Sequence, residues 1–222
     1  MRADPTGGPV IYNVAEPSDA EEVIRLLSTV FSESEPPAVS MGLSARDFEG
    51  FLRLFVPATI DEGITIVARG QDKGSLAGTL LTDDFAQPAA FDGTRISPKF
   101  LPIFSMLEEL DEQFRRGKTI APGQYLHLFM LAVDRQFAGR GVAQGMIAAC
   151  LEDGGRKGYR AAVTEATGRV SQHVFRKQGF VERCSVLYQE FRYEDQLAFA
   201  SIHEHEKAIL MEKSLISSGG DE

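Results

Sequence analysis

The 222-residue sequence has no tryptophan, only two cysteines and no long apolar run. Cys150 and Cys184 form neither a CxxC pair nor the spacing of a zinc site, so we expect no bound metal. So few cysteines favour a reduced, cytoplasmic protein. No stretch reaches the roughly 18 consecutive apolar residues of a membrane helix, and no apolar segment follows the N-terminal MRADPTGGP. We therefore expect neither a signal peptide nor a membrane partner.

Basic residues are also scarce relative to acidic ones. The sequence has 23 Lys and Arg against 32 Asp and Glu, which gives a net charge of −9. A nucleic-acid-binding face needs a dense cluster of basic residues, so we expect no nucleic-acid partner. The acidic balance suits a cationic or neutral partner better. The 43% apolar and 25% charged residues are typical of a globular chain, which we expect to be a monomer or a homodimer.

The hydrophobic pattern alternates between strand and helix periodicity from residue 9 to residue 216. We expect loose termini at 1–8 and 217–222, a loop at 82–97 and one α/β or α+β domain over 9–216 with a mixed sheet. The expected strands are 10–14, 64–68, 76–81, 125–133, 161–166, 185–191 and 208–215. A first helix is expected after Ser18 and a second from near Ser44. Three more are expected over 98–116, 142–153 and 171–178.

Several residues predict where these helices begin, end and face. Ser18 and Glu21 have the spacing of a capping box at the start of the first helix. Pro57 should end the second helix, and Gly154 with Gly155 should end the helix that begins at 142. In the helix over 98–116, the charged residues, Asp111 among them, are expected to form a solvated face.

The segment after the strand over 125–133 has the pattern of an anion site. The turn DRQFAGRG (134–141) joins a nearly unbroken apolar strand to a helix start. A helix N-terminus leaves about four backbone N–H groups unpaired, and glycines let a phosphate approach the backbone closely. Gly139 and Gly141 lie where those groups point, and Arg140 can add a charged contact. A plain strand-to-helix turn explains the same glycines.

Two other phosphate sites are compatible with the segment to different degrees. A Walker P-loop is excluded because the sequence has no Gly-Lys-Ser/Thr. A dinucleotide fingerprint is partly met by Gly139, Gly141 and Gly145, with Glu165 at a later strand end. However, five residues separate Val133 from Gly139, whereas a Rossmann turn follows its strand at once.

Three segments, in this order, resemble the GNAT superfamily of acetyl-CoA-dependent N-acetyltransferases. They are the hairpin ITIVARGQDKGSLAGTLL (64–81), the strand and turn LAVDRQFAGRGVAQGMI (131–147), and VFRKQGF (174–180). The match covers about two thirds of the chain. It implies a central, mostly antiparallel sheet of about six to seven strands flanked by helices, and acetyl-CoA as co-substrate.

The resemblance also implies which residues bind acetyl-CoA. They are Leu131, Ala132, Val133, Ala138, Gly139, Arg140, Gly141, Val142, Ala143, Phe175 and Lys177. The chain departs from the family pattern at two of them. Ala138 occupies the usual Arg or Gln position, although backbone N–H groups would still hold the pyrophosphate. Phe175 occupies a position where many members have a tyrosine that protonates the leaving thiolate, and a phenyl ring has no proton to give.

The N-terminal half is similar to the arylalkylamine (dopamine-type) N-acetyltransferases of insects. The similarity lies in VFSESEPP (30–37), the insert at 98–116 and the spacing from Thr167 to Ser171. It implies that Glu35 is the general base and contacts the substrate. It also implies that hydroxyls at Thr167 and Ser171 assist, with Thr167 at the substrate.

The residues leave other catalytic roles open. His127 lies on the central strand and is a second candidate base, since an unperturbed histidine titrates near neutral pH; a hydrogen-bonded core histidine is the alternative. Ser171 is either a helix N-cap or the proton donor to the thiolate. Glu35 is either the base or a solvated loop residue.

We expect an acyltransferase that acetylates a small primary amine, of the arylalkyl or polyamine type. A protein or peptide N-acetyltransferase and a non-catalytic acyl-CoA-binding sensor are the alternatives. A closed pocket covered by residues 31–62 and 83–97 would favour small amines, whereas an open groove across the central strand would favour peptides.

Overall fold

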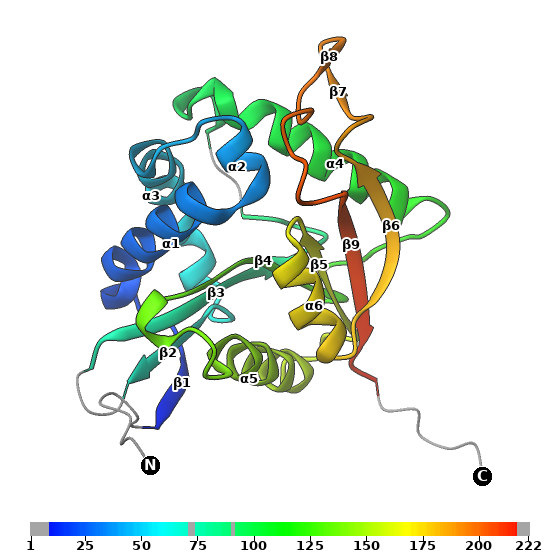
Figure 1. Ribbon diagram of the computed structural model, residues 1–222. Coiled ribbons are helices and arrows are strands. Elements are labelled where there is room, and N and C mark those ends of the chain that lie inside the picture. The colour runs from blue at the N-terminus through cyan, green and yellow to red at the C-terminus, as the bar shows by residue number, and fades with distance from the viewer. Residues whose placement is uncertain (1–8, 71–73, 90–91, 217–222) are drawn as a thin grey trace, which may run out of the picture.

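The computed structural model describes residues 9–70, 74–89 and 92–216, so the expected loose termini lie outside the described residues. A seven-stranded sheet runs through the molecule, with helices on both faces (Figure 1). All neighbouring strands are antiparallel except β4 and β5, which are parallel. This confirms the α/β fold with a mixed, mostly antiparallel sheet. In spatial order the strands are β1 (Val10–Val14), β2 (Ile66–Gly70), β3 (Leu76–Asp84), β4 (Tyr125–Val133), β5 (Ala161–Ala166), β9 (Lys207–Ser214) and β6 (Val181–Leu187).

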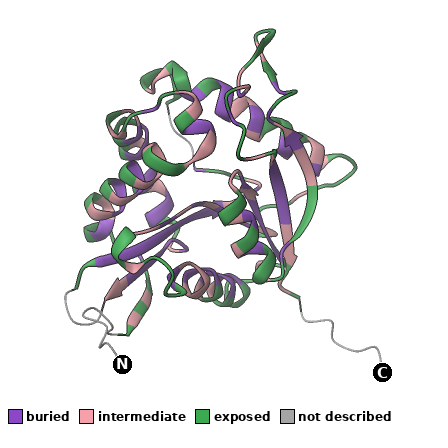
Figure 2. Ribbon diagram, viewed as in Figure 1, coloured by how far each residue is buried: buried purple, intermediate pink, exposed green. Residues whose placement is uncertain are grey.

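Helices divide between the two faces of the sheet (Figure 1). One face carries α1 (Ala20–Ser34), α2 (Pro36–Ser40), α3 (Ala45–Asp61) and α4 (Leu101–Arg115), and the other carries α5 (Val142–Arg156) and α6 (Arg169–Lys177). Each face has its own hydrophobic core, and the central strands between them, above all β3 and β5, are buried over most of their length, whereas the outer strands β1 and β6 are largely exposed (Figure 2). None of the helices in the described residues is both long and apolar enough to cross a membrane.

The prediction that Pro57 ends its helix was wrong. Helix α3 continues to Asp61 and contains Pro57, although proline has no N–H to bond the preceding turn. Val56 and Ile60, on either side of the proline, are buried and hold the helix against the core. The chain leaves the helix at Gly63, whose φ of 68° suits a glycine.

Two further helix boundaries differ from the predictions. Ser18 does not cap α1, because it lies in a short 3₁₀ turn, Pro17–Asp19, in which Asp19 accepts a hydrogen bond from the Glu16 N–H at 2.8 Å. Gly154 does not end α5. A Cβ there would lie 2.6 Å from Leu126, so this glycine permits close packing of the helix on the sheet.

Other elements are displaced or were missed. β2 begins two residues later than expected, α6 begins two residues earlier, and β6 covers Val181–Leu187 rather than 185–191. β3 extends into the expected loop as far as Asp84. The short helix α2 and the small hairpin of β7 (Arg192–Tyr193) and β8 (Gln196–Leu197) were not predicted.

Candidate active site

The central feature of the site is a fork between β4 and β5. The two parallel strands pair only from Tyr125 with Ala161 to His127 with Val163, yet both strands continue beyond that point. The register of β4 against β3 also shifts at Phe129, which forms a bulge. At the base of the fork the Thr164 hydroxyl donates to the Leu128 carbonyl at 2.8 Å. The sheet therefore opens where β4 and β5 separate.

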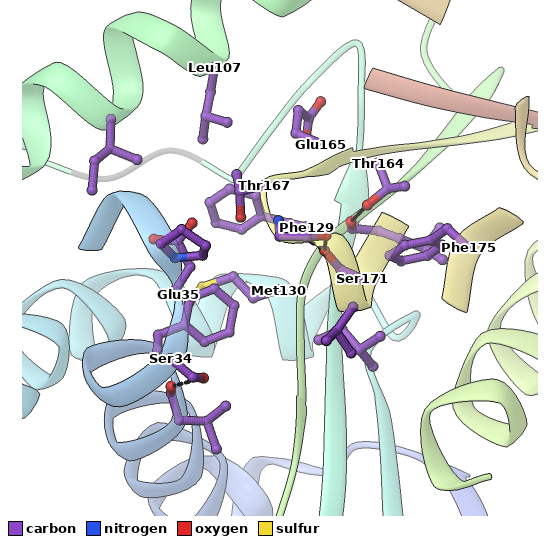
Figure 3. Close-up of a pocket in the computed structure, with 18 of the residues that line it drawn as sticks. Ser34, Glu35, Leu107, Phe129, Met130, Thr164, Glu165, Thr167, Ser171 and Phe175 are labelled. Carbon is purple, nitrogen blue, oxygen red and sulfur yellow. Dashed lines mark hydrogen bonds between the residues drawn. The ribbon is translucent and has the colours of Figure 1, made fainter. Parts of the chain in front are cut away.

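A cavity of about 340 Å³ lies at this fork, within the size range of small-ligand sites (Figure 3). Both strands contribute to its walls, and so do α1, α2, α3, α4 and α6. Much of the lining is aromatic, with Phe48 and Phe100 in edge contact at 5.1 Å and Phe100 stacked on Phe104 at 5.6 Å. Phe129 packs against Phe55 behind it, at 5.1 Å. The cavity thus suits an apolar or aromatic molecule with a few polar groups.

The glycine turn lies near the cavity at the start of α5. Gly139 and Gly141 have φ values of 75° and 77°, and Gly141 is the N-cap of α5. A Cβ on either glycine would meet nothing within 4 Å, so the backbone is open to a ligand there. Ala143, in the first turn of α5, lines the cavity. The N–H groups of this helix start can therefore hold an anion attached to a ligand in the fork.

Glu35 lies between α1 and α2 and lines the cavity (Figure 3). Its carboxylate caps α2 by accepting the Ala38 N–H at 2.6 Å. Burial raises the pKa of Glu35 to about 7, although hydrogen bonds from the Thr167 hydroxyl and the Ala38 N–H act in the opposite direction. All its partners are neutral, so at neutral pH this carboxyl is close to half protonated and can exchange a proton.

Two hydroxyl groups lie on the segment that joins β5 to α6. Thr167 contacts Glu35, and its carbonyl accepts the Tyr188 hydroxyl at 2.6 Å. The Ser171 hydroxyl donates to the Gly168 carbonyl at 2.8 Å and lines the cavity. Gly168, not Ser171, is the N-cap of α6. Glu35, Thr167 and Ser171, expected to act together, therefore line one cavity.

The residues that the sequence predicts to bind acetyl-CoA fall into three groups in the structure. Leu131, Val133, Ala143 and Phe175 line the cavity, and Phe175 is fixed by the Phe180 ring at 5.1 Å. Ala138, Gly139, Arg140 and Gly141 are exposed on the turn, and Val142 is buried behind it. Ala132 is buried in the core on the opposite side of β4, and Lys177 is exposed on α6; neither lines the cavity.

His127 lies behind the cavity wall rather than in the cavity lining. Its Nδ1 lies 2.7 Å from Asp83, and its Nε2 lies 2.7 Å from Glu165. Burial alone would lower the pKa of His127, but the Glu165 and Asp83 carboxylates raise it well above its usual value. Both ring nitrogens therefore carry protons that point at carboxylates. This geometry does not favour His127 as a base, because an imidazolium has no free lone pair.

Asp111 contradicts the prediction of a solvated face on α4. Its side chain is directed to Glu165, and burial together with the Glu165 carboxylate raises the pKa of Asp111 to about 8. Burial alone would raise the pKa of Glu165, but the His127 cation and the hydrogen bonds of His127 and Asp111 lower it. We did not predict this cluster of Asp83, His127, Glu165 and Asp111. One sequence signal existed, because Glu165 alternates with Val163 on the buried face of its strand.

Of the aromatic residues in the first half of the chain, Phe48 and Phe51 line the cavity and Phe85 packs on His127 at 5.5 Å. Phe91 lies outside the described residues. The expected cover by 31–62 is present, whereas no described residue of 83–97 lines the cavity, and α4 closes that side. No group of three or more His, Cys, Asp or Glu residues in the described ranges is arranged to hold a metal ion.

Comparison with family models identifies the fold and its chemistry. Residues 70–180, half of the chain, match the model of the acetyltransferase (GNAT) family. The chain belongs to the GNAT family. The matched residues include the fork, the glycine turn and the whole of α6. The GNAT acetyltransferase domain makes this protein an acyltransferase of the N-acetyltransferase type.

Solved GNAT-like structures resemble the whole described chain. The C-terminal condensation domain of Ebony, in complex with β-alanyl-dopamine, has a TM-score of 0.86 at 18% identity and covers 94% of this chain and 100% of that one. Arylalkylamine N-acetyltransferase 2 from Aedes aegypti has a TM-score of 0.77 at 22% identity, covering 93% and 99%. Drosophila melanogaster polyamine N-acetyltransferase has a TM-score of 0.70 at 16% identity, covering 93% and 100%. At these identities the likeness extends to the fold.

Proposed function

We propose that this protein transfers an acetyl group from acetyl-CoA to the primary amine of a small molecule, of the arylalkyl or polyamine type. The observation that carries the proposal is that Glu35 and Ser171 line one cavity, which opens at the fork between β4 and β5 (Figure 3). A base and a hydroxyl donor on one cavity are the groups that amide formation from a thioester needs. The names of the arylalkylamine and polyamine acetyltransferases among the similar structures support the substrate class.

The residues at the fork fit acetyl-CoA, which would supply a thioester carbonyl carbon for the amine to attack. Leu131 and Val133 would contact the pantetheine arm where β4 has separated from β5. The N–H groups at the start of α5, left open by Gly139 and Gly141, would hold the pyrophosphate. Ala138 removes a side-chain contact but leaves this backbone site intact.

Glu35 is the base in this proposal. An alkylamine is an ammonium ion at neutral pH and cannot attack until it loses a proton. Glu35 accepts that proton in its carboxylate form, and its negative charge attracts the ammonium beforehand. Because burial raises the pKa of Glu35 to about 7, the carboxylate form increases as the pH rises through 7. Activity should rise over the same range.

The departing thiolate needs a proton, and Phe175 cannot provide one. We assign this role to the Ser171 hydroxyl, which lines the same cavity and is held by Gly168. Glu35 takes the ammonium proton before the attack and returns it to solvent after turnover. As the C–N bond forms and the C–S bond breaks, Ser171 gives its proton to sulfur, and the second proton that the nitrogen loses restores the Ser171 hydroxyl. The products are the amide, the CoA thiol and one released proton. Thr167, hydrogen-bonded to Glu35, keeps the base directed at the cavity.

The aromatic cover on one side of the cavity favours a small amine over a peptide. It is formed by Phe51 of α3, Phe104 of α4 and Phe100 of the turn before α4. A peptide chain needs an open groove that it can enter and leave. The sensor alternative rests on Ala138 and Phe175 alone, and turnover distinguishes it from the enzyme.

The test is thiol release from acetyl-CoA with a panel of arylalkylamines, diamines and short peptides, between pH 5 and 9. We expect turnover with small amines that rises through pH 7, and a melting temperature about 5–10 °C higher with saturating acetyl-CoA. Binding of acetyl-CoA without turnover of any acceptor would support the sensor, and peptide-only turnover would support the peptide enzyme.

A matched pair of glycine variants tests where acetyl-CoA binds. Gly141 and Gly117 have similar φ values of 77° and 72°, and a Cβ on either would meet nothing within 4 Å. Gly141→Val should abolish the acetyl-CoA shift in melting temperature, whereas Gly117→Val, equally strained but in the turn after α4 rather than at the start of α5, should keep it. Equal shifts in both variants would contradict a site at the start of α5.

A further inference from the structure

Two buried carboxyl oxygens near the cavity have no hydrogen-bond partner among the described residues other than each other's carboxyl group. They are Oε1 of Glu165 and Oδ1 of Asp111. Glu165 lines the cavity with its side chain only 4% exposed, and Asp111 reaches it from α4. The hydrogen bond between these two carboxyl groups requires one of them to carry a proton, and Asp111, whose pKa is raised, is the group that holds it. A buried carboxylate oxygen is costly when it has no N–H or hydroxyl group to bind. This pair can therefore accept a hydrogen bond from a donor group of a ligand.

The other oxygen of Glu165 is firmly fixed. Glu165 Oε2 lies 2.7 Å from His127, whose second nitrogen lies 2.7 Å from Asp83. One His127 cation between two carboxylates leaves this trio with an excess negative charge. Glu165 is therefore held rigidly, with one oxygen bound to His127 and the other left with only the Asp111 carboxyl as its partner.

The surroundings of Glu165 are otherwise apolar. In Figure 3, Glu165 and Leu107 lie on the same side of the cavity, and Phe129 lies between them and Ser171. Phe104 and Ile103 of α4 line the cavity as well. An apolar wall that contains a single fixed carboxylate discriminates strongly between ligands with and without a donor at that position.

We propose that Glu165 recognises a hydrogen-bond-donating group at the end of the acceptor remote from its reacting amine. This inference rests on the proposed function and makes the preferred acceptor an amine with a second polar end, either a phenolic hydroxyl or a second ammonium. Asp111 keeps Glu165 satisfied while the cavity is empty, and the ligand's donor replaces it on binding. Glu35 would accept the proton of the reacting amine, and Glu165 would accept a hydrogen bond from the distal group.

The experiment compares amines that differ only at the distal end. Tyramine is compared with phenethylamine and with 2-(4-methylphenyl)ethylamine, which controls for size, and 1,4-diaminobutane is compared with butylamine. We expect kcat/KM to favour the distal donor by about tenfold or more in one of the two series, and that series identifies the donor as phenol or ammonium. Each preference is a ratio within one variant, so a general loss of activity cancels.

Two variants change the Glu165–Asp111 pair by different means. In Glu165→Gln the amide can accept from His127 and donate to Asp111, and in Asp111→Asn the amide can donate to Glu165. Both should reduce the preference to about onefold. Glu182→Gln, the same change at a carboxylate that pairs with Lys207 outside the cavity, should keep it. If one of these two variants fails to fold, the other still tests the proposal.

Equilibrium binding of the same amines by calorimetry separates the two proposals. If no amine is acetylated but wild type binds the distal-donor amines more tightly and both variants lose this, the proposed function fails and the inference holds. If amines are acetylated without any distal preference in wild type, or if the preference survives in both variants, the inference is wrong and the function stands.

Discussion

Glu35 and Glu165 line the same cavity, yet their environments differ in one decisive way. Glu35 has only neutral partners, the Thr167 hydroxyl and the Ala38 N–H, and burial raises its pKa to about 7. Glu165 is hydrogen-bonded to a histidine held as a cation, and its pKa is lowered. A carboxyl with neutral partners can gain and lose a proton near neutral pH, whereas one paired with a cation keeps its charge.

The difference shows that burial alone does not decide whether a carboxyl group can exchange a proton near neutral pH. Both groups are removed from water, but only the neutral surroundings of Glu35 leave its proton exchangeable. In the proposed function, Glu35 would transfer the proton and Glu165 would supply the fixed charge. Exchanging or removing the partners should therefore affect the two ends differently.

The largest effect is expected from Glu35→Gln. The amide keeps the cap on α2 but cannot accept the proton of the amine, so kcat/KM should fall by about 10²- to 10⁴-fold. Steady-state thiol-release kinetics at pH 8 measure this. Glu33→Gln is the control, because Glu33 is exposed and pairs with Arg135 at 3.0 Å. Retention of more than half of wild-type activity in Glu35→Gln would remove Glu35 from the mechanism.

The next largest effect is expected from His127→Phe, which leaves Asp83 and Glu165 buried without their shared cation. Removing one partner of a buried ion pair lowers the free energy of unfolding by about 3–5 kcal/mol. Urea denaturation followed by circular dichroism measures the loss. His173→Phe, at an exposed position of α6, should change stability little. A loss below about 1 kcal/mol would mean that His127 is not held as a cation.

The smallest effect is a gain in stability for Glu35→Gln. The folded protein holds the Glu35 proton up to about pH 7, whereas an unfolded chain releases it near the ordinary value of 4.5. The carboxyl therefore destabilises the fold increasingly as the pH rises from 4.5 through 7. The variant should match wild type at pH 4 and exceed it by about 1–3 kcal/mol at pH 8. A constant difference between the two pH values would show that the Glu35 pKa is not raised.

Local patterns in the sequence predicted most of the strands, the glycine turn and most helices. Residues 125–133 form a strand because their apolar run is continuous, and Gly141 caps the next helix as its turn predicts. The family resemblance brought Glu35 and Ser171 to one site, and both line the cavity. The predictions of the strand, the turn and the helices succeeded because each depends on neighbouring residues, whereas the roles of Glu35 and Ser171 stay predictions.

The remaining features depend on contacts between distant segments. Asp111 has the helical position of a solvated residue, and only the approach of Glu165 from β5 makes it part of the site. His127 looks like a base in isolation, but Asp83, 44 residues earlier, and Glu165, 38 residues later, hold both of its nitrogens. No local pattern records those distances, so neither the charge state of His127 nor the contact between Glu165 and Asp111 could be foreseen.

The position of β9 between β5 and β6 has a consequence for the order in which the chain can fold during its synthesis. Glu165 is paired in register with Leu210, so the wall of the cavity on β5 is completed only when that late strand arrives. At about 5–20 residues per second, a ribosome takes roughly two to nine seconds to make the intervening segment. Until then, β5 and β6 present open edges, and the cavity has no rigid far wall. The binding site is thus among the last parts of the nascent chain to form.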